Sequence, residues 1–182
     1  MFGLFNKKKI HLSRADFVVL MLSLQQKIVV ILLRAAQQNF QPNPDAKTLQ
    51  LECEVLSLWI LSLAIQDNDI KDIIHAEYYR HRNFDNDAIK QFCGYLNMRY
   101  EQYYDAFHSW DKDRNGAGGA VLGSVIANGI KGGESDKLEF DIFQMTNALN
   151  IFIENFISTL EFVRDLKKKY DLSEISPVFV TK

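Results

Sequence analysis

Proline and cysteine are scarce in this sequence. Prolines occur only at positions 42, 44 and 177, so most of the chain lacks the residue that most strongly interrupts a helix. The two cysteines, Cys53 and Cys93, do not have the spacing of a disulfide framework or a zinc site. We expect both to be small buried side chains in a reducing compartment, and therefore expect a cytoplasmic protein.

A strong excess of charge of either sign is also absent. The chain has 21 basic and 23 acidic side chains, and its formal net charge is −2. Because nucleic-acid-binding domains usually carry a basic excess or a basic stripe, we expect no nucleic-acid partner.

The apolar stretch 17–33 is interrupted by Gln25, Gln26 and Lys27. A membrane span needs about 20 predominantly apolar residues, so this stretch predicts a core helix and no membrane span.

Sequence motifs of catalysis are missing as well. The sequence has no Gly-x-Ser-x-Gly elbow, no His-Glu-x-x-His pair and no Walker loop. The glycine-rich residues 115–124 superficially match a dinucleotide-binding loop, but they follow a charged helix instead of the strand which that loop requires. These absences favour a protein that is not an enzyme, and they leave the question open.

Apolar residues recur at helical spacing almost throughout, which predicts an all-α fold. We expect an antiparallel bundle of five or six helices, with a glycine-rich connection near residues 111–133. Seven of the nine glycines lie in this region, where they weaken a short helix over residues 120–130. The expected organisation is a basic and apolar N-terminal arm (1–12), a helical bundle domain (13–170) and a C-terminal tail (171–182).

Five helix starts are marked by residues that cap helices. The capping signals are Ser13, Asn43 with Pro44 in the first turn, the two segments Asp67-Asn68-Asp69 and Asp85-Asn86-Asp87, and Asp136 with Glu139 three positions later. The first of these helices is apolar over most of its circumference, so we expect it in the middle of the bundle.

Tyrosine and arginine residues are concentrated between positions 78 and 104. The six that we select as a partner-binding surface are Tyr78, Tyr79, Arg82, Arg99, Tyr103 and Tyr104. Both residue types are enriched at protein–protein interfaces, and adjacent tyrosines cannot both point inward from one helix. The leading hypothesis is therefore a non-enzymatic helical interaction or regulatory protein that binds another protein, with self-association as a homodimer left open.

A metal-binding bundle is the alternative hypothesis. Glu101, Asp105 and His108 are spaced by four and three residues, which places them on one stripe of a helix. A carboxylate and a histidine three residues apart can share a metal, as in ferritin-like di-iron carboxylate bundles. Glu77 and His81 offer a second pair, but its spacing differs from the di-iron pattern.

Residues 106–116 suggest a different metal. This segment resembles the end of the first helix and the start of the loop in EF-hand proteins, with Asp111, Asp113 and Asn115 at the first, third and fifth loop positions. The resemblance implies oxygen ligands for Ca²⁺. The twelfth position is Leu122 in place of the bidentate glutamate, so such a calcium site would be weak. We predict no cofactor beyond these two candidate metal ions.

Overall fold

The computed structural model describes residues 9–40, 44–114, 116–132, 142–173 and 175. In these residues it has six helices and two short strands, which confirms the predicted all-α fold. In chain order the elements are β1 (Ile10–His11), α1 (Arg14–Asn39), α2 (Ala46–Ile65), α3 (Asn68–His81), α4 (Asn86–Lys112), α5 (Ala117–Lys131), α6 (Ile142–Lys169) and β2 (Tyr170–Asp171).

The expected cap at Ser13 is confirmed, and the expected helix starts at residues 67–69 and 85–87 are capped by Asp67 and Asp85. The side chains of Ser13, Asp67 and Asp85 each accept a hydrogen bond from the backbone N–H three residues later, at the starts of α1, α3 and α4. The expected cap of the second helix is wrong. Asp45 caps α2, because its carboxylate accepts from both the backbone N–H and the hydroxyl of Thr48. Asn43 and the Asp136–Glu139 capping box lie outside the described residues.

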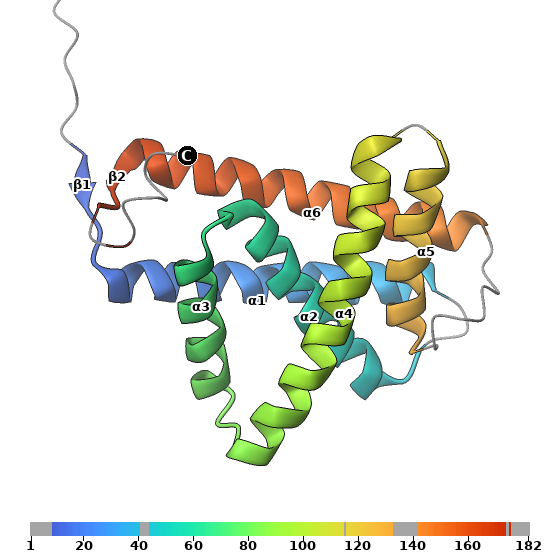
Figure 1. Cartoon of the computed structure of the whole chain (residues 1–182), viewed down its shortest axis with the longest axis horizontal. Coiled ribbons are helices and arrows are strands. Elements are labelled where there is room, and N and C mark those ends of the chain that lie inside the picture. The colour runs from blue at the N-terminus through green and yellow to red at the C-terminus, as the bar shows by residue number, and fades with distance from the viewer. Residues whose placement is uncertain (1–8, 41–43, 115, 133–141, 174, 176–182) are drawn as a thin grey trace, which may run out of the picture.

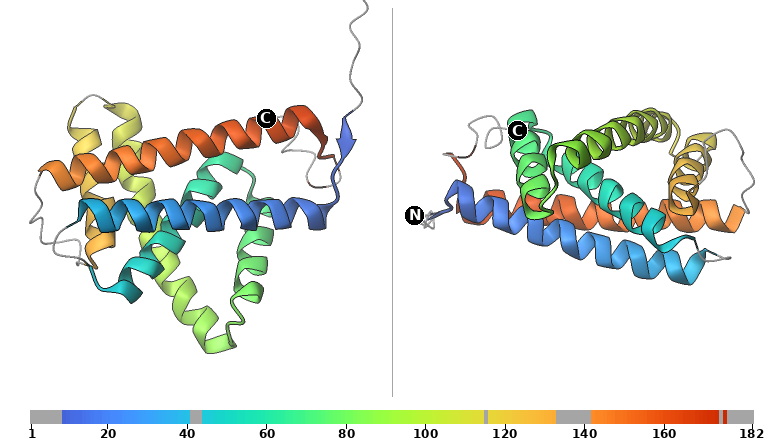
Figure 2. Two further views of the ribbon diagram at one scale, coloured as in Figure 1. Left: turned by 180° about the vertical axis from the view of Figure 1, so that it is seen from behind. Right: turned by 90° about the horizontal axis from the view of Figure 1, so that it is seen from below.

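The central helix is α2 and not α1. Every residue of α2 from 52 to 65 is buried. The right-hand view of Figure 2 shows α2 between α4 and the pair α1 and α6, with α3 and α5 on either side of it. In contrast, α1 lies at the surface, where Val19, Val30 and Ile31 are 59%, 45% and 51% exposed. The expectation that the first helix occupies the middle of the fold is therefore wrong.

The helices form crossed layers. Figure 1 shows α1 and α6 side by side and running in opposite directions. In the same view α4 and α5 are also antiparallel to each other, and they cross the first pair steeply. Trp59 of α2 lies at the centre of the core, stacked against Tyr103 of α4 at 4.8 Å and Phe152 of α6 at 5.1 Å between ring centroids.

The expected glycine-rich connection is mostly a helix. Residues 117–131 form α5, so the link between α4 and α5 is limited to residues 113–116. The glycines are points of close approach: a Cβ on Gly118 would overlap the carbonyl of Ser109, and one on Gly123 would overlap the carbonyl of Met145. Helix packing thus outweighs the low helix propensity of glycine.

The two ends of the described chain meet. β1 and β2 form a parallel pair in which Ile10 lies beside Tyr170. Leu12 and Leu172, which follow the two strands, are both buried in the hydrophobic core. The packed part of the chain therefore extends beyond residues 13–170 on both sides.

Candidate functional site

Most of the six residues expected to form a partner-binding surface are covered by other parts of the chain. Tyr78, Arg99 and Tyr103 are buried, while Tyr79 and Tyr104 are partly buried. The side chain of Arg82 is 48% exposed and forms an ion pair with Glu54. These six residues therefore do not form a continuous exposed surface, because the hydroxyls and guanidinium groups of several of them bind buried carboxylates of α2.

Glu52 is the first of these carboxylates. Its oxygens accept hydrogen bonds from Tyr95 at 2.7 Å, from the Nε and Nη2 atoms of Arg99, and from the hydroxyl of Tyr103. The same Nη2 atom of Arg99 donates to the carbonyl oxygen of Val125 on α5 at 3.0 Å. Burial and the neighbouring Glu52 carboxylate raise the pKa of Tyr103 well above its usual value, so this hydroxyl stays protonated and donates. The cluster joins α2, α4 and α5.

Glu54, two residues later, is the second carboxylate. It accepts hydrogen bonds from the hydroxyl of Tyr78 and from Nε2 of Gln50, the latter at 2.7 Å, and Arg82 Nη2 lies 3.2 Å from its Oε1. Sequence reasoning missed both glutamates as organising residues. Two carboxylates within a largely apolar helix were the available signal, because buried acidic groups require partners.

A third polar cluster lies between α3 and α4. His75 Nε2 is 3.1 Å from the hydroxyl of Tyr100, which is also 3.4 Å from Ser62 Oγ of α2. Burial lowers the pKa of His75 from 6.5 to about 4, against an opposing effect of Asp72. This imidazole is therefore neutral near pH 7 and serves as a hydrogen-bonding group.

The residues of the expected metal site lie on the outer side of α4. Glu101, Asp105 and His108 are all exposed. Glu77, from the expected second pair, binds Arg80 through Arg80 Nη2–Glu77 Oε2 at 2.6 Å. Within the described ranges of the chain, no group of three or more His, Cys, Asp or Glu side chains is arranged to hold a metal ion.

The expected calcium loop does not have the form of an EF-hand loop. Of the twelve positions that would begin at Asp111, residues 111–112 belong to α4 and residues 117–122 belong to α5. The Asp111 carboxylate binds Arg114, and Asp113 ends α4 as its C-terminal cap. Asn115 lies outside the described residues. The glycine-rich residues from 117 onward are helical, which differs from the loop that the resemblance implies, and calcium binding by Asp111 and Asp113 stays a prediction.

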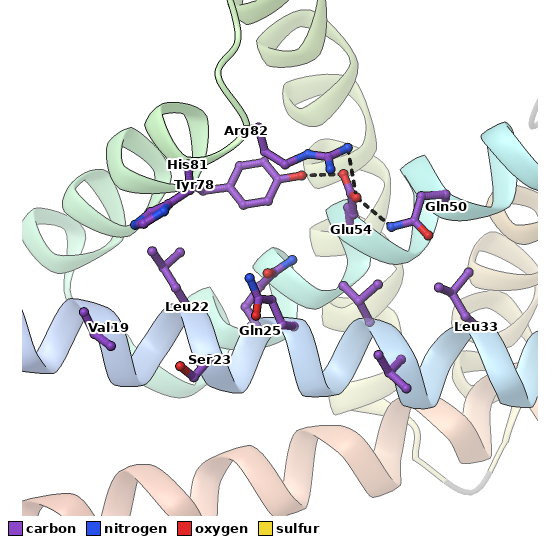
Figure 3. A pocket seen from close by; sticks show the side chains of 13 residues that line it. Val19, Leu22, Ser23, Gln25, Leu33, Gln50, Glu54, Tyr78, His81 and Arg82 are labelled. Carbon is purple, nitrogen blue, oxygen red and sulfur yellow. Dashed lines mark hydrogen bonds and ion pairs between the residues drawn. The ribbon is translucent and has the colours of Figure 1, made fainter.

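A hollow that is open to a ligand is bounded by α1, α2 and the end of α3, and we call it the α1 hollow. Its volume is about 620 Å³, within the range of ligand-binding pockets. Its apolar residues come from α1 and are Val19, Leu22, Val29, Val30 and Leu33. Figure 3 shows Tyr78 and Arg82 reaching from the end of α3 to Glu54 on α2, so that this polar bridge faces the apolar side of α1.

The polar groups that line the α1 hollow differ in how many hydrogen-bond partners they have within the protein. Glu54 is bound by Tyr78, Gln50 and Arg82. Gln25 is buried and lines the hollow, and its Nε2 donates to Ser57 Oγ at 2.8 Å. Among the interactions of the described residues, its amide oxygen has no partner. This oxygen is available to accept a hydrogen bond from a bound group.

A comparison with known proteins finds no matching family model, no similar curated protein and no similar solved structure.

Two of the described helices, α1 and α2, are long and apolar enough to cross a membrane by length and composition alone. A core helix passes the same test, and α2 is such a helix because its residues 52–65 are buried in the protein.

Proposed function

We propose that this protein is a non-enzymatic helical interaction protein, and that it binds another protein at the α1 hollow and the adjoining exposed side of α1. The observation that carries the proposal is the exposure of Val19 and Val30 at the edge of the hollow. Exposed apolar side chains are common singly, but here they adjoin a concave apolar surface. The proposed surface lies mainly on α1, and of the six tyrosine and arginine residues only Tyr78 and Arg82 line it.

The character of α1 supports this proposal. A helix at the surface of a globular protein usually presents polar residues to water. Here the outer side of α1 carries Val19, Val30 and Ile31 in addition to its buried apolar side. Contact with a partner would remove these side chains from water. This burial favours binding by about 25 cal/mol of free energy for each Å² of apolar surface.

Site-specific photo-crosslinking tests the proposal. A photoreactive amino acid placed at Val30 is expected to give one discrete cross-linked protein, and Val19→Asp is expected to abolish that product. The matched control is the same photoreactive residue at Ile157, an apolar side chain of α6 that is 49% exposed. Equal cross-linking from both positions, or no product from Val30, would refute the proposal.

Sedimentation of the purified protein separates a second copy from a different partner. If the partner is another copy of this chain, the mass doubles at micromolar concentration and returns to that of a monomer in the Val19→Asp variant. A monomer at all concentrations assigns the cross-linked product to a different protein. The proposed cytoplasmic location predicts that this partner is a cytoplasmic protein.

A further inference from the structure

We infer that the α1 hollow binds an acidic amphipathic helix of the partner protein. The inference rests on the proposed function and specifies the chemistry of the bound segment. Three observations support it: the spacing of the residues along α1, the charges beside the hollow, and the remaining hydrogen-bonding capacity of Arg82 and Gln25.

The spacing along α1 matches a docked helix. Val19, Gln26 and Leu33 all line the hollow and are seven residues apart, so they share one side of α1. Ser23 and Val30 line it as well, each four residues after another lining residue. From residue 19 to residue 33 the helix rises by roughly 21 Å, or about four turns. A partner helix of similar length can place residues at positions i, i+4 and i+7 along this stripe.

The groups already in the hollow disfavour a basic segment. Glu54 is the carboxylate that lines it, and Tyr78, Gln50 and Arg82 already bind its oxygens. A lysine or arginine of a partner would have to compete with these internal partners. It would also meet the Arg82 guanidinium, which carries charge of the same sign.

The charges next to the hollow favour an acidic segment. Although the whole chain has a net charge of −2, α1 carries three basic residues and one acidic residue. Lys27 and Arg34 directly follow the lining residues Gln26 and Leu33, and both are exposed. Neither is in an ion pair with any residue that the structure describes. Carboxylates flanking the apolar stripe of a partner helix would complement these two charges.

Arg82 and Gln25 supply specific polar contacts. The guanidinium group of Arg82 has five N–H donors, and its ion pair with Glu54 uses Nη2. The other donors suit a carboxylate of the partner, because a guanidinium and a carboxylate can form two parallel hydrogen bonds. The amide oxygen of Gln25 provides one acceptor for a hydroxyl or amide donor on the apolar side of the same helix.

A second hollow, of about 420 Å³, continues along α1 beyond Val19 and His81, which line both. Its lining includes the basic residues Arg14 and Arg80 and the acidic residue Glu77, which forms an ion pair with Arg80. A bound helix that extends past His81 would therefore meet one further basic side chain, Arg14, whose charge is not offset by an ion pair among the described residues. Together the two hollows predict that the acidic residues of the partner helix are distributed along its length and not limited to one end.

Fluorescence anisotropy with synthetic peptides tests the inference. The probe is an 18-residue labelled helical peptide with leucines at i, i+4 and i+7 and glutamates on the flanks. The comparison peptides carry lysine or glutamine in place of every glutamate. The acidic peptide is expected to bind at least about tenfold more tightly than the glutamine peptide at low salt, and the difference is expected to shrink as salt rises.

Variants of the protein locate the binding site. Arg82→Gln is expected to weaken the binding of the acidic peptide by about five- to tenfold and to leave the affinity for the glutamine peptide unchanged. Val30→Asp is expected to abolish binding of both peptides. Ile157→Asp is the control for an exposed apolar position elsewhere and is expected to change neither. Circular dichroism of each variant confirms that it is folded before binding is measured.

Three outcomes would overturn the inference. The first is binding of the lysine peptide at least as tightly as the acidic one, and the second is an unchanged affinity in Val30→Asp. The third is binding of palmitate, with none of the peptides bound, which would make the hollow a site for a fatty acid. If no peptide binds while cross-linking from Val30 persists, the inference fails and the proposed function stands.

Discussion

Glu52 and Arg99 form an ion pair in the interior of the protein, with Arg99 Nη2 2.7 Å from Glu52 Oε1 and side-chain exposures of 0% and 5%. Burying two charges is costly unless they are paired and hydrogen-bonded, and both conditions are met here. Gly129 of α5 packs directly on this pair. The position of α5 therefore depends on a residue without a side chain.

Gly129→Ala is expected to destabilise the protein, because a Cβ at this position would overlap both Glu52 Oε1 and Arg99 Nη2. We expect a loss of about 3 kcal/mol and a fall in Tm of about 6–12 °C. Gly94→Ala is the control, since a Cβ there has no neighbour within 4 Å. Replacing this helical glycine is expected to stabilise the protein by up to about 1 kcal/mol. Equal effects of the two substitutions in thermal unfolding would contradict the close packing at Gly129.

Removal of one partner of the buried ion pair is expected to cost about 3–5 kcal/mol, because the other charge is left unpaired. Glu52→Gln and Arg99→Met are the single variants, and urea unfolding measures the change in unfolding free energy. The double variant is expected to lose clearly less than the sum of the two, because no unpaired charge remains. Additive losses would show that the two residues act independently.

The stability is expected to depend on pH through His75. Its pKa in the folded protein is about 4, against an ordinary value of 6.5, so the unfolded chain takes up a proton at higher pH than the folded chain does. The stabilisation that comes from the neutral His75 is fully present above pH 6.5. It is lost progressively as the pH falls from 6.5 to 4, and below pH 4 no further stability is lost through this group. The total loss is at most about 3 kcal/mol.

His75→Gln isolates this contribution, because glutamine can still bind the hydroxyl of Tyr100 and does not titrate. The measurement is the difference in unfolding free energy between the original protein and the variant at pH 7.5, 5.5 and 4. The unfolding free energy of the original protein is expected to fall relative to that of the variant between pH 7.5 and pH 4, by up to about 3 kcal/mol. A difference that is independent of pH would mean that His75 is solvated in the folded state.

The features predicted correctly from the sequence are those set by nearby residues. The all-α fold follows from the spacing of apolar residues, and the caps at Ser13, Asp67 and Asp85 are each satisfied three positions later in the chain. Pro44 predicts a cap for α2 at Asn43, because proline is common in the first turn of helices. Asp45 replaces it since Thr48 offers two donors to the same carboxylate.

The features missed depend on residues far apart in the chain. Glu52 binds Arg99, 47 residues later, and this contact buries side chains that had been expected at a surface. Both α1 and α2 are apolar, and sequence patterning does not show which of them is enclosed by the others. The α1 hollow combines three helices, so no single segment contains its signature.

The parallel pair β1–β2 holds the two ends of the folded region together, with Ile10 beside Tyr170. A force that pulled these two positions apart would first separate this two-residue ladder and then load α1 and α6, which lie side by side and run in opposite directions (Figure 1). Conversely, a short linker that joined the two ends would create a circular chain without disturbing any helix. New ends could then be opened in the link between α4 and α5, far from the α1 hollow in sequence.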